Sequence, residues 1–211
     1  MKIFKSRQSE NENKKRSDAE VSIQNRPERI HMTASEDTSA IALALAEISD
    51  GNTHAVTVIY ERMGRQILSL GRAITGSQSS CEDVLQETVL KIIENIHTYR
   101  KGGNAKAWIM AIARNAAIDM KNRASKFGTE LDTDRTNLES GREYDFSSTS
   151  QSEILDVMSA LSRLDDTDRE IVVMKAMTGL KHKDIAKLLG ITTDASKKRY
   201  RRALERLRAL I

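Results

Sequence analysis

The sequence predicts an all-α protein of two small helical domains joined by a flexible acidic linker, and three observations support this prediction. Apolar residues recur every three or four positions through most of the chain, without the alternation typical of β-strands. This periodicity stops between residues 126 and 150. The last 48 residues then follow the pattern of a helix-turn-helix. A chain of 211 residues suits one or two domains, and we expect these at residues 35–125 and 151–211.

Residues 1–34 precede the helical pattern and are polar, with mixed charge and the only proline, Pro27. Such a composition buries too little apolar surface to offset the entropy lost on ordering. We therefore expect a disordered N-terminal extension at residues 1–34. Residues 126–150 are expected to form a flexible linker, which is acidic because residues 129–151 hold six acids and two arginines.

The first domain is expected to contain three strong helices. The first has an apolar face built from Ile59, Met63, Ile67, Leu70 and Ile74. Ser80, followed by Asp83, resembles a capping box and predicts the start of the second helix. That helix has an apolar face with Leu85, Val89, Ile92 and Ile96 and an acidic-polar face opposite. The third helix spans about residues 105–123, with Trp108, Ile112 and Ile118 on its apolar side.

The helical pattern of the second domain is expected to begin at residue 152, and the domain is expected to end in the helix-turn-helix. Ala186 is small enough to let two helices approach, and Gly190 supplies the backbone freedom of the turn. The following helix, residues 193–208, carries seven Lys or Arg residues and two acids, as expected of a helix that lies against phosphates.

Ser196 is the unusual residue of this last helix, because its position calls for an apolar side chain packed on the preceding helix. We expect its hydroxyl to bond to the carbonyl of Thr192, to leave a small gap, or to face DNA. In the first two cases Ser196→Val would stabilise the domain by about 1 kcal/mol.

Charge is distributed unevenly, although the whole chain is only +4. Residues 175–208 contain eleven basic and three acidic residues, and residues 99–126 contain seven basic residues and one acid. Two basic modules separated by an acidic connector indicate nucleic acid as the partner of both. Solvated helix faces are the alternative explanation for such charge runs.

Several function classes find no support in the sequence. Cys81 is the only cysteine, and the four histidines lack metal-ligand spacing, so we expect no metal and no cofactor. A carboxylate cluster, a nucleophile–base pair and a phosphate loop are all missing, which argues against an enzyme. The N-terminus lacks the apolar stretch of a signal peptide, and the longest apolar run, residues 40–46, is too short to span a bilayer. We therefore expect a cytoplasmic protein without membrane insertion.

The segment of residues 99–123 combines aromatic and basic residues around a Gly-Gly loop. Aromatic faces stack on unpaired bases while cations follow the backbone, so this combination favours single-stranded DNA. A flipped base could also be held beside Asn104. For Trp108 itself, an ordinary core position is the alternative. The candidate residues are Tyr99, Arg100, Lys101, Asn104, Lys106, Trp108, Arg114, Asn115, Lys121 and Arg123.

Two segments of the first domain, CEDVLQET at residues 81–88 and AWIMAIARNAAID at 107–119, resemble region 2 of the extracytoplasmic-function group of sigma-70 factors. The C-terminal segment, with DIAKLLGI at residues 184–191, resembles region 4 of the same group. Together the two resemblances cover about residues 38–125 and 152–211, in the family's order.

The resemblance implies a promoter-specificity subunit of bacterial RNA polymerase. It implies that Glu82, Asp83, Gln86 and Glu87 dock on the clamp helices of the β′ subunit, and that the β flap is a further contact. It implies that residues 99–123 melt and hold the −10 element and that the linker threads toward the RNA exit path. For the −35 element it implies Thr193, Asp194, Lys197, Lys198, Arg201 and Arg202. An anti-sigma factor is a further implied partner.

The chain departs from the family pattern at Asp184, where a glutamate is usual, and at Ala195 and Ser196, where a threonine-valine pair is usual. These departures bear on −35 recognition more than on the fold. The alternative function is a helix-turn-helix regulator that binds duplex DNA without core polymerase, which leaves the first domain without a role.

Overall fold

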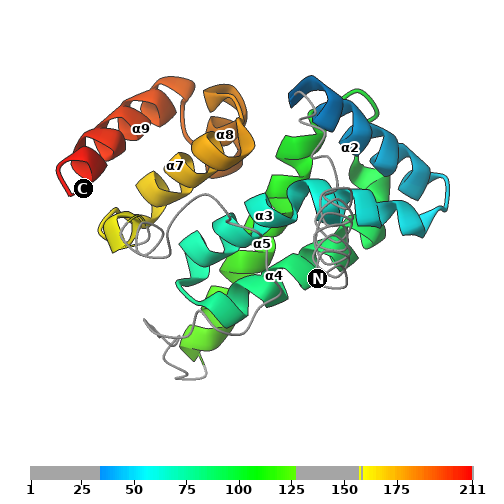
Figure 1. Cartoon of the computed structure of the whole chain (residues 1–211), viewed down its shortest axis with the longest axis horizontal. Coiled ribbons are helices and arrows are strands. Elements are labelled where there is room, and N and C mark those ends of the chain that lie inside the picture. Colours follow the sequence, from blue (N-terminus) through cyan, green and yellow to red (C-terminus); the bar gives the residue numbers. More distant parts are fainter. Residues whose placement is uncertain (1–33, 127–156, 158, 211) are drawn as a thin grey trace, which may run out of the picture. The chain divides into compact units, whose positions relative to one another are not determined.

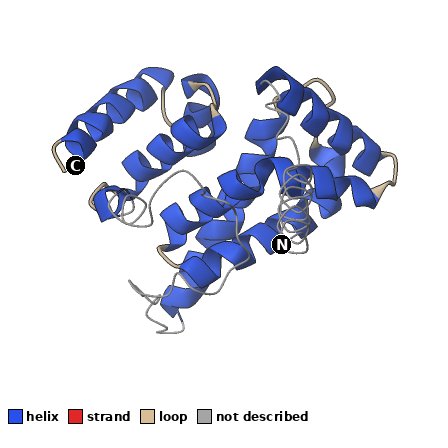
Figure 2. Cartoon of the chain, in the orientation of Figure 1, coloured by secondary structure: helices blue, strands red, loops and turns tan. Residues whose placement is uncertain are grey.

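The computed structural model describes residues 34–126, 157 and 159–210, and all elements in these ranges are helical (Figures 1 and 2). The all-α prediction is therefore confirmed. The expected disordered extension and flexible linker lie outside the described residues, except for Ala34 and Lys126, which are the first residue of α2 and the last residue of α5. Among the described helices, none combines the length and the apolar composition that a bilayer span requires.

Four helices form the first helical set: α2 (Ala34–Ser49), α3 (Val56–Thr75), α4 (Gln78–Glu94) and α5 (Ala105–Lys126). Short 3-10 turns, η1 (Thr53–Ala55) and η2 (Ile96–Thr98), follow α2 and α4. Helices α3, α4 and α5 pack against one another, and α2 packs on α3 and α5. This mutual packing buries one face of each helix. On α5 the buried face contains Ile109, Met110 and Ala113, whereas the predicted apolar side of Trp108, Ile112 and Ile118 is only half-buried.

The core position of α3 follows from its sequence pattern. Ile59, Met63, Ile67 and Leu70 are all fully buried, as the three-to-four spacing predicts. On the side facing α4, a Cβ added at Gly71 would lie 3.2 Å from the Cβ of Cys81, so a side chain there would require α4 to shift by a few tenths of an ångström. Gly76 ends α3 in a left-handed conformation with φ of 76°, which glycine adopts without strain.

Helix α4 begins three residues earlier than the capping-box prediction placed it. Its N-cap is Ser77, whose hydroxyl accepts a hydrogen bond from the amide of Ser80 at 3.3 Å. Ser77 has an extended backbone directly after Gly76, as an N-cap requires. Ser80 is therefore inside the first turn, and the prediction of a capping box at Ser80 was wrong.

The C-terminal set consists of α7 (Asp166–Thr178), α8 (His182–Leu189) and α9 (Thr193–Arg208), after a helical segment at residues 159–162. Asp165 caps α7 by accepting from the amide of Asp168 at 2.9 Å, and Thr192 caps α9 in the same way through Ala195 at 3.1 Å. These caps define the starts of both helices.

The helix-turn-helix is α8, the turn and α9. Ala186 is buried, and Gly190 adopts a left-handed φ of 66° while its amide donates to the carbonyl of Ala186. Both residues therefore play the roles that the sequence predicts. The motif packs on α7, where Ile171 and Met174 are fully buried together with Ile185 of α8.

Helix α7 also packs against α3. Arg169 of α7 donates to the carbonyl of Ala73, near the end of α3, at 3.0 Å. The same guanidinium donates to the carbonyls of Leu161 and Leu164, at 2.9 and 2.8 Å. Arg169 thus links the last turn of α3 to the residues that precede α7.

Candidate nucleic-acid interface

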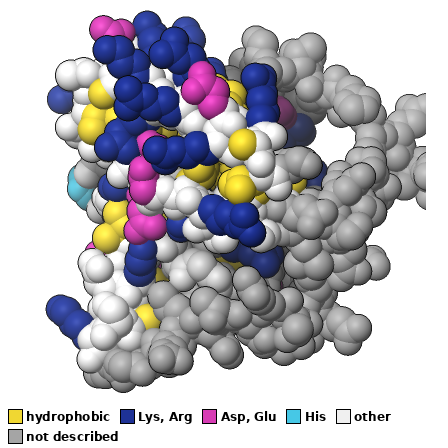
Figure 3. Space-filling view, turned by 90° about the vertical axis from the view of Figure 1, so that its left-hand side faces the viewer, with side chains coloured by type: hydrophobic (Ala, Val, Ile, Leu, Met, Phe, Trp, Pro, Cys, Tyr) yellow, Lys and Arg dark blue, Asp and Glu magenta, His cyan; other side chains and the backbone are white. Residues whose placement is uncertain are grey.

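One face of α9 is exposed and basic. Lys197, Lys198, Arg201 and Arg202 are all exposed, as is Asp194, while Thr193 is half-buried at the start of the helix. Figure 3 shows Lys and Arg side chains gathered on this side of the molecule, with few acidic side chains between them. The predicted −35 residues therefore share one accessible face, which is the geometry that contact with a phosphate backbone needs.

Two of the seven basic residues of α9 lie on a different face. Arg199 and Arg206 pair with Asp168 of α7, at 2.9 Å and 3.7 Å. Asp168 is only 4 % exposed, so these two guanidinium groups take the place of the water that would solvate an exposed carboxylate. Neighbouring Asp165 has a lowered pKa, first because it accepts the amide of Asp168 and also because Arg199 and Arg206 are near. The basic count of the sequence thus overstated the DNA-facing charge of α9.

Ser196 is fully buried, which confirms its position against the first helix of the motif. Its hydroxyl lies 3.0 Å from Nδ1 of His182, the first residue of α8. The carbonyl of Thr192, which was the expected partner of the hydroxyl, instead accepts a hydrogen bond from the backbone amide of Ser196. A hydroxyl that faces DNA, the other expectation, is excluded because the side chain is fully buried. Both expectations were wrong because the actual partner is 14 residues away in sequence.

In the predicted −10 segment, Tyr99 and Trp108 form an aromatic pair with ring centroids 5.4 Å apart and planes tilted by 53°. Both are half-buried, and Nε1 of Trp108 donates to Oγ1 of Thr98 at 3.2 Å. Trp108 thus packs on the core with one edge and keeps part of its ring accessible. Arg100, Lys101 and Asn104 of the preceding loop are exposed.

Asn104 has two roles at the start of α5. Its Oδ1 accepts from the amide of Ala107 at 3.1 Å, and its Nδ2 donates to Asp184 of α8 at 2.9 Å. The first bond caps α5, and the second links the loop to the residue where the chain departs from the family pattern.

Three predicted −10 residues are engaged by acids of the C-terminal helices. Besides Asn104, Arg114 donates to Glu170 at 2.5 Å and Lys121 donates to Asp166 at 2.7 Å. The Glu170 side chain is 9 % exposed, whereas that of Asp166 is 62 % exposed. The hydrogen bond from Lys121 is the main reason that the pKa of Asp166 is lowered. In this arrangement DNA phosphates would have to displace these carboxylates.

The remaining −10 candidates lie along α5 on accessible surface. Lys106 is half-buried, and Asn115 and Arg123 are exposed. Arg123 lies far along the helix from the aromatic pair, beside a groove between α4 and α5, so the ten candidates do not form one cluster.

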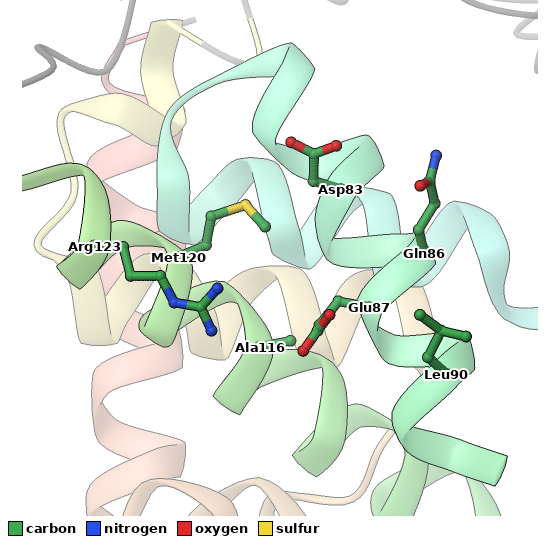
Figure 4. Close-up of a pocket in the computed structure, with 7 residues that line it drawn as sticks. All are labelled: Asp83, Gln86, Glu87, Leu90, Ala116, Met120 and Arg123. Atoms are coloured by element: carbon green, nitrogen blue, oxygen red, sulfur yellow. The ribbon is translucent and has the colours of Figure 1, made fainter. Parts of the chain in front are cut away.

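A groove of about 250 Å³ lies between α4 and α5 (Figure 4). Its α4 wall contains three of the predicted polymerase-binding residues, and its α5 wall contains Arg123. The full lining is Asp83, Gln86, Glu87, Leu90, Ala116, Met120 and Arg123. Glu82 is half-buried and outside this lining. Glu87 also pairs with Lys91 at 3.3 Å, and Lys91 with Asp119 at 3.5 Å.

Leu90 is one of three residues of this groove that the sequence pattern missed, together with Ala116 and Met120. It is 57 % exposed and adds apolar surface to the groove. The signal was available, because Leu90 falls outside the buried stripe of Leu85 and Ile92 and between acidic-polar positions of α4. An apolar side chain among acids suits a helical protein partner with basic and apolar side chains.

Cys81 is buried between α3 and α4, and burial raises the pKa of its thiol to about 11. The thiol is therefore protonated at neutral pH and unreactive as a redox sensor. Among the residues that the structure describes, no three His, Cys, Asp or Glu side chains gather as metal ligands would.

Comparison with known proteins agrees with this geometry. The Sigma-70 region 2 family matches residues 59–127, and the Sigma-70 region 4 family matches residues 154–207, together more than half of the chain. Sigma factor NccH of Alcaligenes xylosoxydans is 26 % identical over 77 % of this chain and 90 % of its own length. CnrH of Cupriavidus metallidurans is 27 % identical over 83 % of this chain and 95 % of its own length.

Two solved structures share the fold. CnrH, in complex with the cytosolic domain of CnrY, has a TM-score of 0.59 and 22 % identity, over 81 % of this chain and 96 % of its own. The sigma factor RpoE of Bartonella quintana, in complex with the anti-sigma factor NepR, has a TM-score of 0.57 and 24 % identity, over 72 % of this chain and 95 % of its own. The chain thus combines a region 2 match and a region 4 match, in that order, with a basic recognition helix. It belongs to the extracytoplasmic-function group of the sigma-70 family and is a promoter-recognising sigma factor of bacterial RNA polymerase.

Proposed function

We propose that the groove between α4 and α5 docks on the β′ clamp helices of core polymerase. We further propose that α5 and the loop before it, residues 99–104, hold the melted −10 strand. The exposed face of α9 then enters the major groove at the −35 element. One observation carries the proposal: the cations of α9 divide into two sets. Arg199 and Arg206 are bound to Asp168 inside the domain, so the other side of α9 is left to contact DNA.

In the −35 assignment, the N-terminal half of α9 approaches base edges, as recognition helices do. Lys197, Lys198, Arg201 and Arg202 are the phosphate or base contacts, and Thr193 and Asp194 lie at the helix start that enters the groove. In the −10 assignment, Tyr99 and Trp108 offer aromatic faces while Arg100, Lys101 and the α5 cations follow the strand. Accommodating the strand there requires that Arg114 and Lys121 leave Glu170 and Asp166.

The domain limits proposed for these roles are residues 35–125 for region 2 and 151–211 for region 4, with residues 126–150 as the connector and 1–34 as an extension. As a transcription initiation factor the chain works through core polymerase and needs no active site or cofactor of its own. Its place of action is the cytoplasm, where the polymerase works.

An anti-sigma factor is a further proposed partner. Two solved structures with the same fold are complexes, one of CnrH with the cytosolic domain of CnrY and one of RpoE with the anti-sigma factor NepR. This chain offers exposed apolar residues beside its acidic positions, such as Leu90, on which a helical inhibitor could compete with core polymerase.

The experiment that tests the proposal compares promoter binding with and without core RNA polymerase. Duplexes enriched from a random library by the holoenzyme are used in gel shifts, and unpaired thymines are mapped with permanganate. We expect weak binding by the full-length chain alone, and tight binding with strand opening when core is present. Tight, sequence-specific binding without core and without opening would contradict the proposal and support the helix-turn-helix regulator.

A further inference from the structure

The DNA-facing half of α9 has few attachments to the rest of the domain. Only two residues of α9 are fully buried, Ser196 and Ala203. Ala203 packs with Leu164 and Val172 in a small cluster that holds the C-terminal half. The ion pairs to Asp168 are made from Arg199 and Arg206, which also lie beyond the first turn of the helix. Ser196 is therefore the one buried residue of the first turn.

Ser196 connects this turn to α8 through a single polar contact. Its hydroxyl, fully buried, lies 3.0 Å from Nδ1 of His182. The ring of Tyr200, one turn further along α9, meets the ring of His182 nearly edge-on, at 5.4 Å between centroids and 64° between planes. One imidazole thus touches two successive turns of α9 from the start of α8.

This contact restrains the direction of α9 more tightly than an apolar one would. A serine hydroxyl is one carbon from the backbone, so its hydrogen bond acts on the helix itself rather than through a flexible side chain. Hydrogen bonds weaken steeply as their distance and angle depart from the optimum, whereas apolar contacts are non-directional. Lys197 and Lys198 follow Ser196 directly, so a tilt of this turn moves them relative to the DNA.

From this geometry we propose that His182, acting through Ser196, is a positioning residue for −35 recognition: it sets the angle at which α9 is presented to the major groove. The inference rests on the proposed role of α9 at the −35 element. It assigns a recognition role to a residue that does not touch DNA.

Neutral His182 suits this role. Its pKa is lowered, first by burial and then by Lys175 of α7 and Lys197 of α9. At neutral pH the ring is therefore uncharged, and its nitrogen can accept the proton of the Ser196 hydroxyl or donate to its oxygen.

The test uses the full-length chain assembled with core RNA polymerase and duplexes enriched by the wild-type holoenzyme from a library randomised at the −35 element. The quantity measured is discrimination, the ratio of affinities for the enriched duplex and for duplexes with one −35 base pair changed. We expect His182→Ala to lower discrimination about three- to tenfold, the fold-change that corresponds to losing one neutral hydrogen bond. We expect Ser196→Ala to have the same effect, and the double variant to be no worse than either single one.

Rescue separates positioning from general stability. In His182→Asn the side-chain oxygen lies close to the place of Nδ1, so we expect discrimination to return to within about twofold of wild type while the aromatic contact to Tyr200 is lost. The matched control is His54→Ala, an exposed histidine in η1, which should leave discrimination unchanged. If His182→Ala proves unfolded by circular dichroism, His182→Asn and Ser196→Ala decide the question.

Unchanged discrimination in folded His182→Ala, or in Ser196→Ala, would overturn the proposal, as would a failure of His182→Asn to restore it. The role of α9 is tested separately with Lys197→Ala and Arg201→Ala. If these two variants also leave promoter binding unchanged, the −35 assignment itself fails. If they weaken binding while the His182 variants discriminate normally, only the positioning role fails.

Discussion

The carboxylate of Asp168 is expected to be the most important single charge for the stability of the helix-turn-helix. It is 4 % exposed and binds Arg199 at 2.9 Å and Arg206 at 3.7 Å. We predict that Asp168→Ala lowers the free energy of unfolding of the C-terminal domain, because it removes the anchor between α7 and α9.

The magnitude follows from the exposure of the partners. Removing one partner of a fully buried pair costs about 3–5 kcal/mol. Here the Arg199 and Arg206 side chains are 42 % and 59 % exposed, so water can solvate them once the carboxylate is gone. The loss should therefore be nearer to that of one hydrogen bond to a charged group, about 2 kcal/mol. For a chain of this size that corresponds to a decrease in melting temperature of about 4–8 °C.

The assay is urea unfolding of the full-length chain, followed by circular dichroism, with thermal melts in parallel. Asp168→Asn should lose about half as much, because a neutral oxygen still accepts from Arg199. The control is Asp194→Asn in α9, whose side chain is 82 % exposed and pairs with Lys197 at 3.7 Å, and which should change stability by less than about 0.5 kcal/mol. Equal losses at Asp168 and Asp194 would refute the reasoning, because burial would then play no part.

Three further predictions concern the acids near α5, the groove and His182. Glu170→Gln should raise the affinity of the holoenzyme for single-stranded −10 oligonucleotides about fivefold, because it releases Arg114. Glu205→Gln is the control. No increase in affinity would mean that Glu170 does not compete with DNA for Arg114. Replacing Asp83 and Glu87 with lysine should abolish binding to core polymerase in pull-downs, while the melting temperature changes little because both side chains lie at the surface. Unchanged affinity for core polymerase would show that the groove is not part of the docking site. Because the pKa of His182 is lowered from 6.5 in the folded chain, the unfolded chain binds the proton more readily. The difference in free energy of unfolding between wild type and His182→Asn should therefore be constant above about pH 6.5, and wild type should lose stability relative to the variant as the pH falls below this value. A difference that does not vary with pH would contradict this prediction.

The −10 segment shows how far sequence reasoning reached. Aromatic and basic residues around a Gly-Gly loop located the segment, and the loop residues are exposed as that function needs. The engagement of Arg114 and Lys121 by Glu170 and Asp166 was not predictable, because the partners are 56 and 45 residues away and no local pattern relates them. The assignment of these residues to DNA therefore stays a prediction, whereas the structure defines the carboxylates that Arg114 and Lys121 bind in the free chain.

By itself the sequence determined the all-α class, the buried face of α3 and the turn of the DNA-binding motif. These depend on interactions between residues three or four positions apart and on the conformational freedom of Gly190, so they are written locally in the chain. Only the tertiary structure decided which charges remain for DNA and which hold the fold together. Arg199 and Arg201 are the same residue type, yet they lie on opposite sides of α9 because they are two positions apart. Arg199 therefore binds Asp168, whereas Arg201 is exposed. The same holds for Ser196, whose burial followed from helical register but whose partner, His182, is set by the crossing of two helices.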